Sequence, residues 1–211
     1  MTNNWIKNVS DNLFPLSQEQ ADIKKCLSEW FYYDNTHDLE TPCEDCELCG
    51  QQGIRFQFEI ENNKTGKALL IGSECIKRFS IGVMDADGKI LSNIAANKKV
   101  DKDRRTLISD AKTKRMIRSL VGLSQKDTKF NDIDKSIEYF KERGAFSPNH
   151  LAFLLWRLEE NEVEFNKSDF KMTIRRRREK SQLLQMEDWK VRKILPSMSA
   201  SQKKFYHDNK E

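Results

Sequence analysis

The sequence contains no apolar run that approaches the roughly 20 residues needed to cross a bilayer, and residues 1–5 lack the basic and apolar regions of a secretory signal. These two absences argue against membrane spans and against export. We therefore expect a cytoplasmic protein that has no membrane partner. In that reducing compartment disulfide bonds are disfavoured, and clustered cysteines are more often metal ligands.

The signatures of common enzymes are also missing. The sequence has no His-Glu-x-x-His motif, no glycine-rich phosphate-binding loop and no nucleophile elbow, and its three histidines are far apart. Asp132 and Asp134 could belong to a metal-dependent nuclease, but their place at the start of a predicted helix gives them a simpler role. The sequence thus predicts that the protein is not an enzyme.

Cysteine is scarce, with five residues in a chain of 211. An odd number fits a set of four metal ligands and one bystander better than a set of disulfide bonds. Cys26 lies in a predicted helix, far in sequence from the other cysteines, and is interpreted as a small core residue. The remaining four are Cys43, Cys46, Cys49 and Cys75.

These four cysteines predict one structural Zn²⁺ site. Cys46, Cys49 and Gly50 have the spacing of a zinc knuckle, in which glycine permits a left-handed backbone after the second thiolate. Cys75 follows a predicted hairpin and lies in the first turn of a predicted helix, where the helix N-terminus favours a thiolate. Four thiolates would close the coordination shell, so that zinc would fold the module rather than catalyse a reaction.

The fourth ligand of this site is open to two interpretations. Cys43 precedes the knuckle with a further Cys-x-x-Cys spacing and is the first choice. His37 is the substitute if Cys43 points away from the metal, because imidazole is also a good zinc ligand.

Local patterns predict a β-hairpin followed by helices. Strict alternation over residues 54–61 is typical of a half-buried strand, and a turn-rich segment then leads to a second strand at residues 67–71. Upstream, a capping-box pattern at Ser17 and helical spacing through Phe31 predict a helix over residues 17–33. Further helices are predicted over residues 74–79, 102–121, 133–143, 148–158, 174–184, 188–195 and 201–206.

Together these elements predict an α+β protein, in which a zinc-stapled β-hairpin module accompanies a mostly helical remainder. The expected organisation has three parts. They are an N-terminal helical segment at residues 1–36, a zinc-binding hairpin module at residues 37–92, and a helical domain with a basic C-terminal region at residues 93–211.

The cysteine and hairpin region resembles small zinc-ribbon or treble-clef-like proteins of phages and other mobile elements. The similar segments are residues 46–50, 54–56, 60–62, 65–66 and 71–79, with further similarity at residues 168–171, 189–196 and 201–202. The resemblance implies an accessory protein that engages host machinery. Metal-containing anti-CRISPR proteins, which inhibit the type II CRISPR nuclease, are one class that it is similar to.

Charge is distributed very unevenly along the chain. Residues 1–61 contain four basic and twelve acidic residues, whereas residues 171–211 contain twelve basic and five acidic residues. Such a division predicts separate surfaces for partners of opposite charge.

The basic region is a candidate surface for nucleic acid or a protein partner, because arginine binds phosphates through a fixed fork of donors. The alternative is a solvated helix face. The members of the basic region are Arg175, Arg176, Arg177, Arg178, Lys180, Lys190, Arg192 and Lys193.

The acidic region, which adjoins the cysteines, is a candidate surface for a basic groove on a partner. The alternative is a solubilising loop. The members of the acidic region are Asp34, Asp38, Glu40, Glu44, Asp45 and Glu47.

Two functions remain from the sequence. The first is a zinc-binding interaction protein that engages a host protein of nucleic-acid metabolism or defence, as an inhibitor. The second is a nucleic-acid-binding accessory protein in replication, recombination or transcription, for which binding would weaken steeply with salt.

Overall fold

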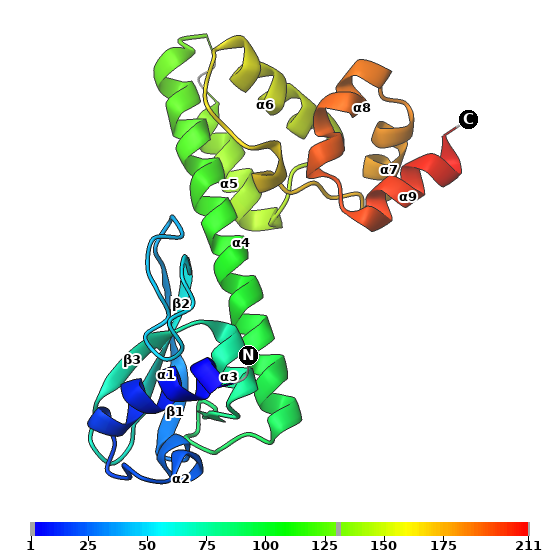
Figure 1. The fold of residues 1–211 in the computed structure, drawn as a ribbon. Helices are drawn as coiled ribbons and strands as arrows, with labels where there is room; N and C mark the ends of the chain where they lie inside the picture. Colours follow the sequence, from blue (N-terminus) through cyan, green and yellow to red (C-terminus); the bar gives the residue numbers. More distant parts are fainter. Residues whose placement is uncertain (1–2, 130–131, 211) are drawn as a thin grey trace. The chain divides into compact units, whose positions relative to one another are not determined.

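The structure is a computed structural model that describes residues 3–129 and 132–210 (Figure 1). Helices and a small sheet make it an α+β protein, as predicted. The chain forms two compact units, Met1–Ala111 (unit 1) and Lys112–Glu211 (unit 2). The division therefore falls inside one helix, α4 (Asn93–Lys126), whereas the predicted boundary after residue 36 falls inside a strand.

Unit 1 contains the sheet and the cysteines. Its elements are α1 (Asn3–Leu13), η1 (Phe14–Leu16), α2 (Ile23–Leu27), β1 (Trp30–Asp38), β2 (Phe56–Asn62), β3 (Ala68–Ile71), α3 (Ser73–Arg78), β4 (Gly82–Val83) and the first part of α4. The strands follow the order β3-β2-β1-β4, in which β1 is antiparallel to β2 and parallel to β4.

The predicted hairpin is confirmed as β2 and β3. These strands are antiparallel, with Phe58 opposite Ile71 and Ile60 opposite Leu69. The turn between them closes through the Gly66 N–H, which donates to the Asn62 carbonyl at 2.8 Å. Alternation places the apolar side chains of β2 in the core of unit 1, as a period of two residues requires.

Of the helix predicted over residues 17–33, only α2 is helical. Residues 17–22 before it are not helical, and β1 begins at Trp30. Trp30 and Tyr32 are fully buried, and the Tyr32 ring lies 5.5 Å from that of Phe58 on β2. Aromatic residues fit a pleated surface, and pairing with β2 outweighs their helical spacing. Ser17 is likewise not a helix cap, since its buried hydroxyl accepts a hydrogen bond from Trp30 Nε1 at 2.8 Å.

Unit 2 is helical around its own apolar core. After the second part of α4, its elements are α5 (Ile133–Arg143), α6 (Pro148–Glu160), η2 (Lys167–Asp169), α7 (Arg177–Leu184), α8 (Asp188–Ile194), η3 (Leu195–Ser197) and α9 (Ala200–Asn209). The predicted helix over residues 133–143 is confirmed, and it ends at Gly144 with a left-handed backbone, φ +69°. The predicted start of a helix at residue 148 is also confirmed, with Ser147 before Pro148 as the N-cap of α6.

None of the helices within residues 3–129 and 132–210 combines the length and the apolar character that crossing a bilayer requires.

Candidate metal centre and basic cleft

The Cys46–Gly50 turn has the backbone of a knuckle. The Gly50 N–H donates to the Cys46 carbonyl at 2.8 Å, and Gly50 has φ +73°, which a glycine adopts without strain. The turn is attached to β3 in both directions, because the Glu47 N–H donates to the Leu70 carbonyl at 3.1 Å and Glu47 Oε2 accepts from the Leu70 N–H at 2.5 Å. The hairpin thus fixes the position of the first two thiols.

Cys75 on α3 completes a group of three sulfurs. Cys75 Sγ lies 3.7 Å from Cys46 Sγ and 3.3 Å from Cys49 Sγ. All three cysteines are buried, and their sulfurs lie within 4.8 Å of one another. Thiolates at about 2.3 Å from a tetrahedral zinc ion lie about 3.8 Å apart. The group could therefore hold a metal ion.

The three thiols differ in their acidity. Hydrogen bonds from Cys75 and from the Gly72 N–H outweigh the effect of burial and lower the pKa of Cys46 to about 5. Burial raises the pKa of Cys49. The hydrogen bond with Cys46, together with burial, raises that of Cys75. Two of the three thiols consequently need a nearby cation to become thiolates at neutral pH.

The two residues considered for the fourth ligand lie outside this group. Cys43 is exposed and follows a tight turn in which its N–H donates to the Thr41 carbonyl at 3.0 Å. His37 is exposed on β1, and its Nε2 lies 3.2 Å from Glu59 Oε2. Within the described part of the chain, Cys46, Cys49 and Cys75 are thus the predicted ligands that the fold brings together.

Cys26 is a buried core residue, as predicted. Its thiol donates to the Ser17 hydroxyl at 3.1 Å, and burial raises its pKa. It belongs to the apolar core of unit 1 and not to the metal-binding group.

A cleft of about 410 Å³ adjoins the three sulfurs. One of its walls is aromatic and cationic, since the Arg78 guanidinium lies 3.7 Å above the Trp5 ring. Its other members are Gln51, Gly53, Ile54, Arg55, Phe56, Gly72, Ser73, Glu74 and Arg104 together with the cysteines. The candidate metal centre therefore has a route to solvent.

Much of the predicted acidic surface serves the fold of unit 1. Asp38 accepts two hydrogen bonds from the Arg55 guanidinium, at 2.7 and 3.0 Å. Asp34 forms an ion pair with Lys99. Asp45 accepts from a backbone N–H at 3.4 Å, and Glu47 holds β3 as described above. Of the predicted set, Glu40 and Glu44 are exposed.

The predicted basic surface divides into two parts. On α8, Lys190 pairs with Glu187 at 2.9 Å and Lys193 pairs with Glu159, so that these lysines are neutralised within unit 2, whereas Arg192 is exposed. The second part is the arginine run before and at the start of α7. All four of its members, Arg175, Arg176, Arg177 and Arg178, are exposed.

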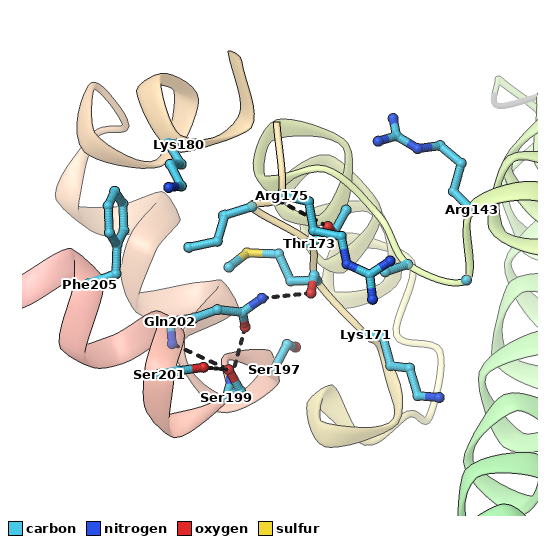
Figure 2. A pocket seen from close by; sticks show the side chains of 14 residues that line it. Arg143, Lys171, Thr173, Arg175, Lys180, Ser197, Ser199, Ser201, Gln202 and Phe205 are labelled. Carbon is cyan, nitrogen blue, oxygen red and sulfur yellow. Dashed lines mark hydrogen bonds between the residues drawn. The ribbon is translucent and has the colours of Figure 1, made fainter. Parts of the chain in front are cut away.

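Arg175, the first residue of the arginine run, lines a hollow of about 660 Å³ in unit 2 that we call the basic cleft. Of the predicted basic surface, Arg175 and Lys180 belong to this lining. Figure 2 shows Lys180 and Phe205 on one side of it and Arg143 and Lys171 on the other, with Arg175 between them. Four basic side chains and no acidic one line this cleft. Its remaining lining residues are Gly144, Ala145, Met172, Thr173, Ile174, Ser197, Ser199, Ser201 and Gln202.

Buried contacts hold the cleft in shape. Arg143 donates to Glu179 at 2.5 Å, and the Glu179 carboxylate also accepts from the Arg176 N–H at 3.0 Å. Burial alone would raise the pKa of Glu179. The hydrogen bonds outweigh that effect, so the pKa is lowered overall and Glu179 remains an anion. Gln202 Nε2 donates to the Met172 carbonyl at 2.8 Å. Arg143 is therefore paired with a carboxylate, whereas Arg175 and Lys180 have no carboxylate within ion-pair distance among the described residues.

Sequence patterns did not assign Arg143 or the three serines to this cleft. They come from segments far apart in the chain. An isolated bridge between Phe146 and Met172 joins the segment after Arg143 to the one that follows Lys171, and the hydrogen bond from Gln202 to the Met172 carbonyl joins the serine segment to both. No signal in the sequence links these positions. Asp132 and Asp134 do not join a group of three metal-ligating residues in the described part of the chain, and Asp132 pairs with Lys135 at 2.7 Å.

No protein-family model, curated protein or solved structure matches the chain.

Proposed function

We propose that this protein is a zinc-binding, non-catalytic protein that binds nucleic acid through the basic cleft of unit 2. The observation that carries the proposal is the lining of that cleft, with four basic side chains and no carboxylate. Lysine and arginine neutralise backbone phosphates, and serine hydroxyls donate to phosphate oxygens. A cleft of this composition suits a chain of phosphodiesters better than any neutral ligand.

Arg175 and Lys180 supply the principal contacts in this proposal. Among the described residues, no carboxylate lies within ion-pair distance of either side chain. Lys180 Nζ lies 5.2 Å from the centre of the Phe205 ring, which offers an apolar face beside a cation. That combination suits a base next to its phosphate, as in single-stranded nucleic acid.

Zinc is the metal that the cysteine group fits best in this proposal. Three thiolates at tetrahedral spacing suit a soft or borderline ion, and carboxylates, which magnesium and calcium prefer, are absent from the group within the described residues. In its structural role the ion joins the knuckle to α3 and so fixes the cysteine region of unit 1.

The test of nucleic-acid binding is fluorescence anisotropy with labelled single-stranded and duplex oligonucleotides over a range of salt concentrations. We expect the affinity to fall as salt rises, and the double variant Arg175→Ala/Lys180→Ala to reduce the slope of log K against log[salt] by roughly one per lost contact. The matched control is Lys203→Ala/Lys204→Ala, which removes the same charge from α9 outside the cleft lining. Equal losses in both variants, or no binding at low salt, would contradict the proposal.

A protein-interaction role is the second candidate, and exposed aromatic residues of unit 2 favour it. Phe153 and Trp189 are 40% and 43% exposed, and they line a hollow of about 260 Å³ with Trp156. Exposed aromatic patches are typical of protein interfaces. The partner in this hypothesis is a host nucleic-acid enzyme of the kind that the resemblance implies, including the type II CRISPR nuclease, which the protein would inhibit.

This second candidate is tested by capturing partners from host lysate treated with nuclease. One protein retained by the wild type and lost by Phe153→Ala/Trp189→Ala supports it, and the basic-cleft variant should retain that partner. Loss of every partner after nuclease treatment would show that nucleic acid bridges them.

A further inference from the structure

The cysteine group supplies three ligands and borders a cleft that contains unpaired positive charge. A tetrahedral zinc ion needs four ligands. In the described part of the chain no fourth cysteine, histidine or carboxylate joins Cys46, Cys49 and Cys75. All three of these cysteines line the cleft of about 410 Å³. When these three sulfurs bind the metal, the fourth coordination position therefore lies toward that cleft.

We propose that the fourth ligand is an exogenous thiolate that reaches the metal through this cleft. The inference rests on the proposed metal binding and adds to it the class of ligand. Zinc prefers soft or borderline donors, and a thiol becomes a good ligand when it loses its proton, here to solvent. The bond that forms joins the metal to the incoming sulfur, and no oxidant or reductant is needed.

Arg78 offsets the negative charge that a fourth thiolate would add to the centre. Three thiolates and a divalent ion have a net charge of −1, and a fourth thiolate changes that net charge to −2. Among the described residues, no carboxylate lies within ion-pair distance of Arg78, whose guanidinium rests on the Trp5 ring. Arg104 also lines the cleft but lies 3.6 Å from Glu74. Arg78 is thus the cation in the cleft that can offset the added negative charge.

The cleft is also large enough for the ligand. A volume of about 410 Å³ lies within the range of small-molecule sites. Ile54, Phe56 and Trp5 provide apolar surface in its lining. A small organic thiol has a sulfur on an apolar stem and fits such a lining. The test uses the small thiol.

The experiment is absorption spectroscopy of the full chain with Co²⁺ in place of zinc, under a thiol-free phosphine reductant. We expect one Co²⁺ per chain, sulfur-to-cobalt charge-transfer bands, and a saturable change of these bands when 2-mercaptoethanol is added. Cys43→Ser should behave as the wild type, because Cys43 is not a ligand in this proposal. Arg78→Gln should weaken the thiol affinity at least severalfold, whereas the matched control Arg105→Gln, outside the cleft lining, should leave it unchanged.

Three results would count against these proposals, and they are distinguishable. Failure to bind Co²⁺ or Zn²⁺ would overturn the metal centre itself. Stoichiometric Co²⁺ with bands that the thiol does not alter, and that Cys43→Ser does alter, would indicate a closed site of four cysteines and overturn the exogenous ligand. A thiol response that Arg78→Gln and Arg105→Gln leave equally strong would overturn the role of Arg78.

Discussion

His150 Nε2 lies 3.1 Å from the hydroxyl oxygen of Ser136, and this contact joins the first turn of α6 to α5. The imidazole is enclosed by aromatic rings, since its centre lies 5.0 Å from that of Tyr139 and 5.1 Å from that of Phe146, both nearly edge-on. Burial lowers the pKa of His150 below its ordinary value. The folded protein therefore favours the neutral imidazole.

The first prediction concerns the pH dependence of stability. Because the folded pKa of His150 is depressed, the unfolded chain binds a proton more readily, and the free energy of unfolding decreases as pH falls below about 6.5. This contribution is fully present above pH 6.5. Urea unfolding at pH 5, 6 and 7 should show a smaller decrease for His150→Gln than for the wild type. His207→Gln, an exposed residue of α9, is the control and should follow the wild type.

The second prediction concerns an ion pair in unit 2 in which the carboxylate is buried and the guanidinium is half-buried. Arg115 donates two hydrogen bonds of 2.7 Å to the carboxylate of Asp169, which is only 2% exposed. Removing the cation leaves a charge in the interior, which costs about 3–5 kcal/mol. We expect Arg115→Ala to lower the free energy of unfolding by about that amount in chemical denaturation. The double variant Arg115→Met/Asp169→Leu should recover most of the loss, and equal destabilisation of both variants would contradict the argument.

Local signals explain which parts of the fold the sequence predicts well. Alternation over residues 54–61 gives the first strand of the hairpin, and the bounds of α5 agree with its predicted range. Gly144 and the Ser147-Pro148 pair mark helix ends through their own backbone preferences. In each case the decisive residues lie within a few positions of the element that they determine.

Contacts between distant segments explain where the structure differs from the expected local pattern. Residues 23–31 have helical spacing, yet Trp30 and Phe31 enter a strand because β2 and β4 pair with it. The sequence predicts Cys43 as a ligand from spacing alone. Cys43 is instead exposed. It lies between the turn at Thr41 and an isolated bridge that pairs Glu44 with Ile54. Neither pairing is encoded within the local pattern.

The third prediction concerns a glycine that an aromatic ring covers. Gly82 lies opposite Phe31 in the β1–β4 pair, and a Cβ placed on Gly82 would lie 2.4 Å from a ring carbon of Phe31. Phe31 is 7% exposed, so the ring has little space into which it can move. Gly82→Ala should therefore lower the free energy of unfolding by about 1–3 kcal/mol, the usual cost of overpacking. Thermal denaturation should show partial recovery in Gly82→Ala/Phe31→Leu, and full stability of the single variant would disprove the contact.

The fourth prediction separates the cysteines by their effect on metal content and folding. Elemental analysis should find one zinc per chain in the wild type, in Cys26→Ser and in Cys43→Ser, and much less in Cys49→Ser. The binding free energy of a structural zinc, about 10–16 kcal/mol in small modules, is comparable to the whole stability of a small domain. Cys49→Ser, or wild type treated with a chelator, should consequently lose the fold of unit 1 at temperatures where Cys43→Ser remains folded. Cys43 and Cys49 both belong to the predicted set of ligands, so equal loss of metal in the two variants would support a site of four cysteines. A wild-type protein that is folded without metal would contradict the zinc proposal.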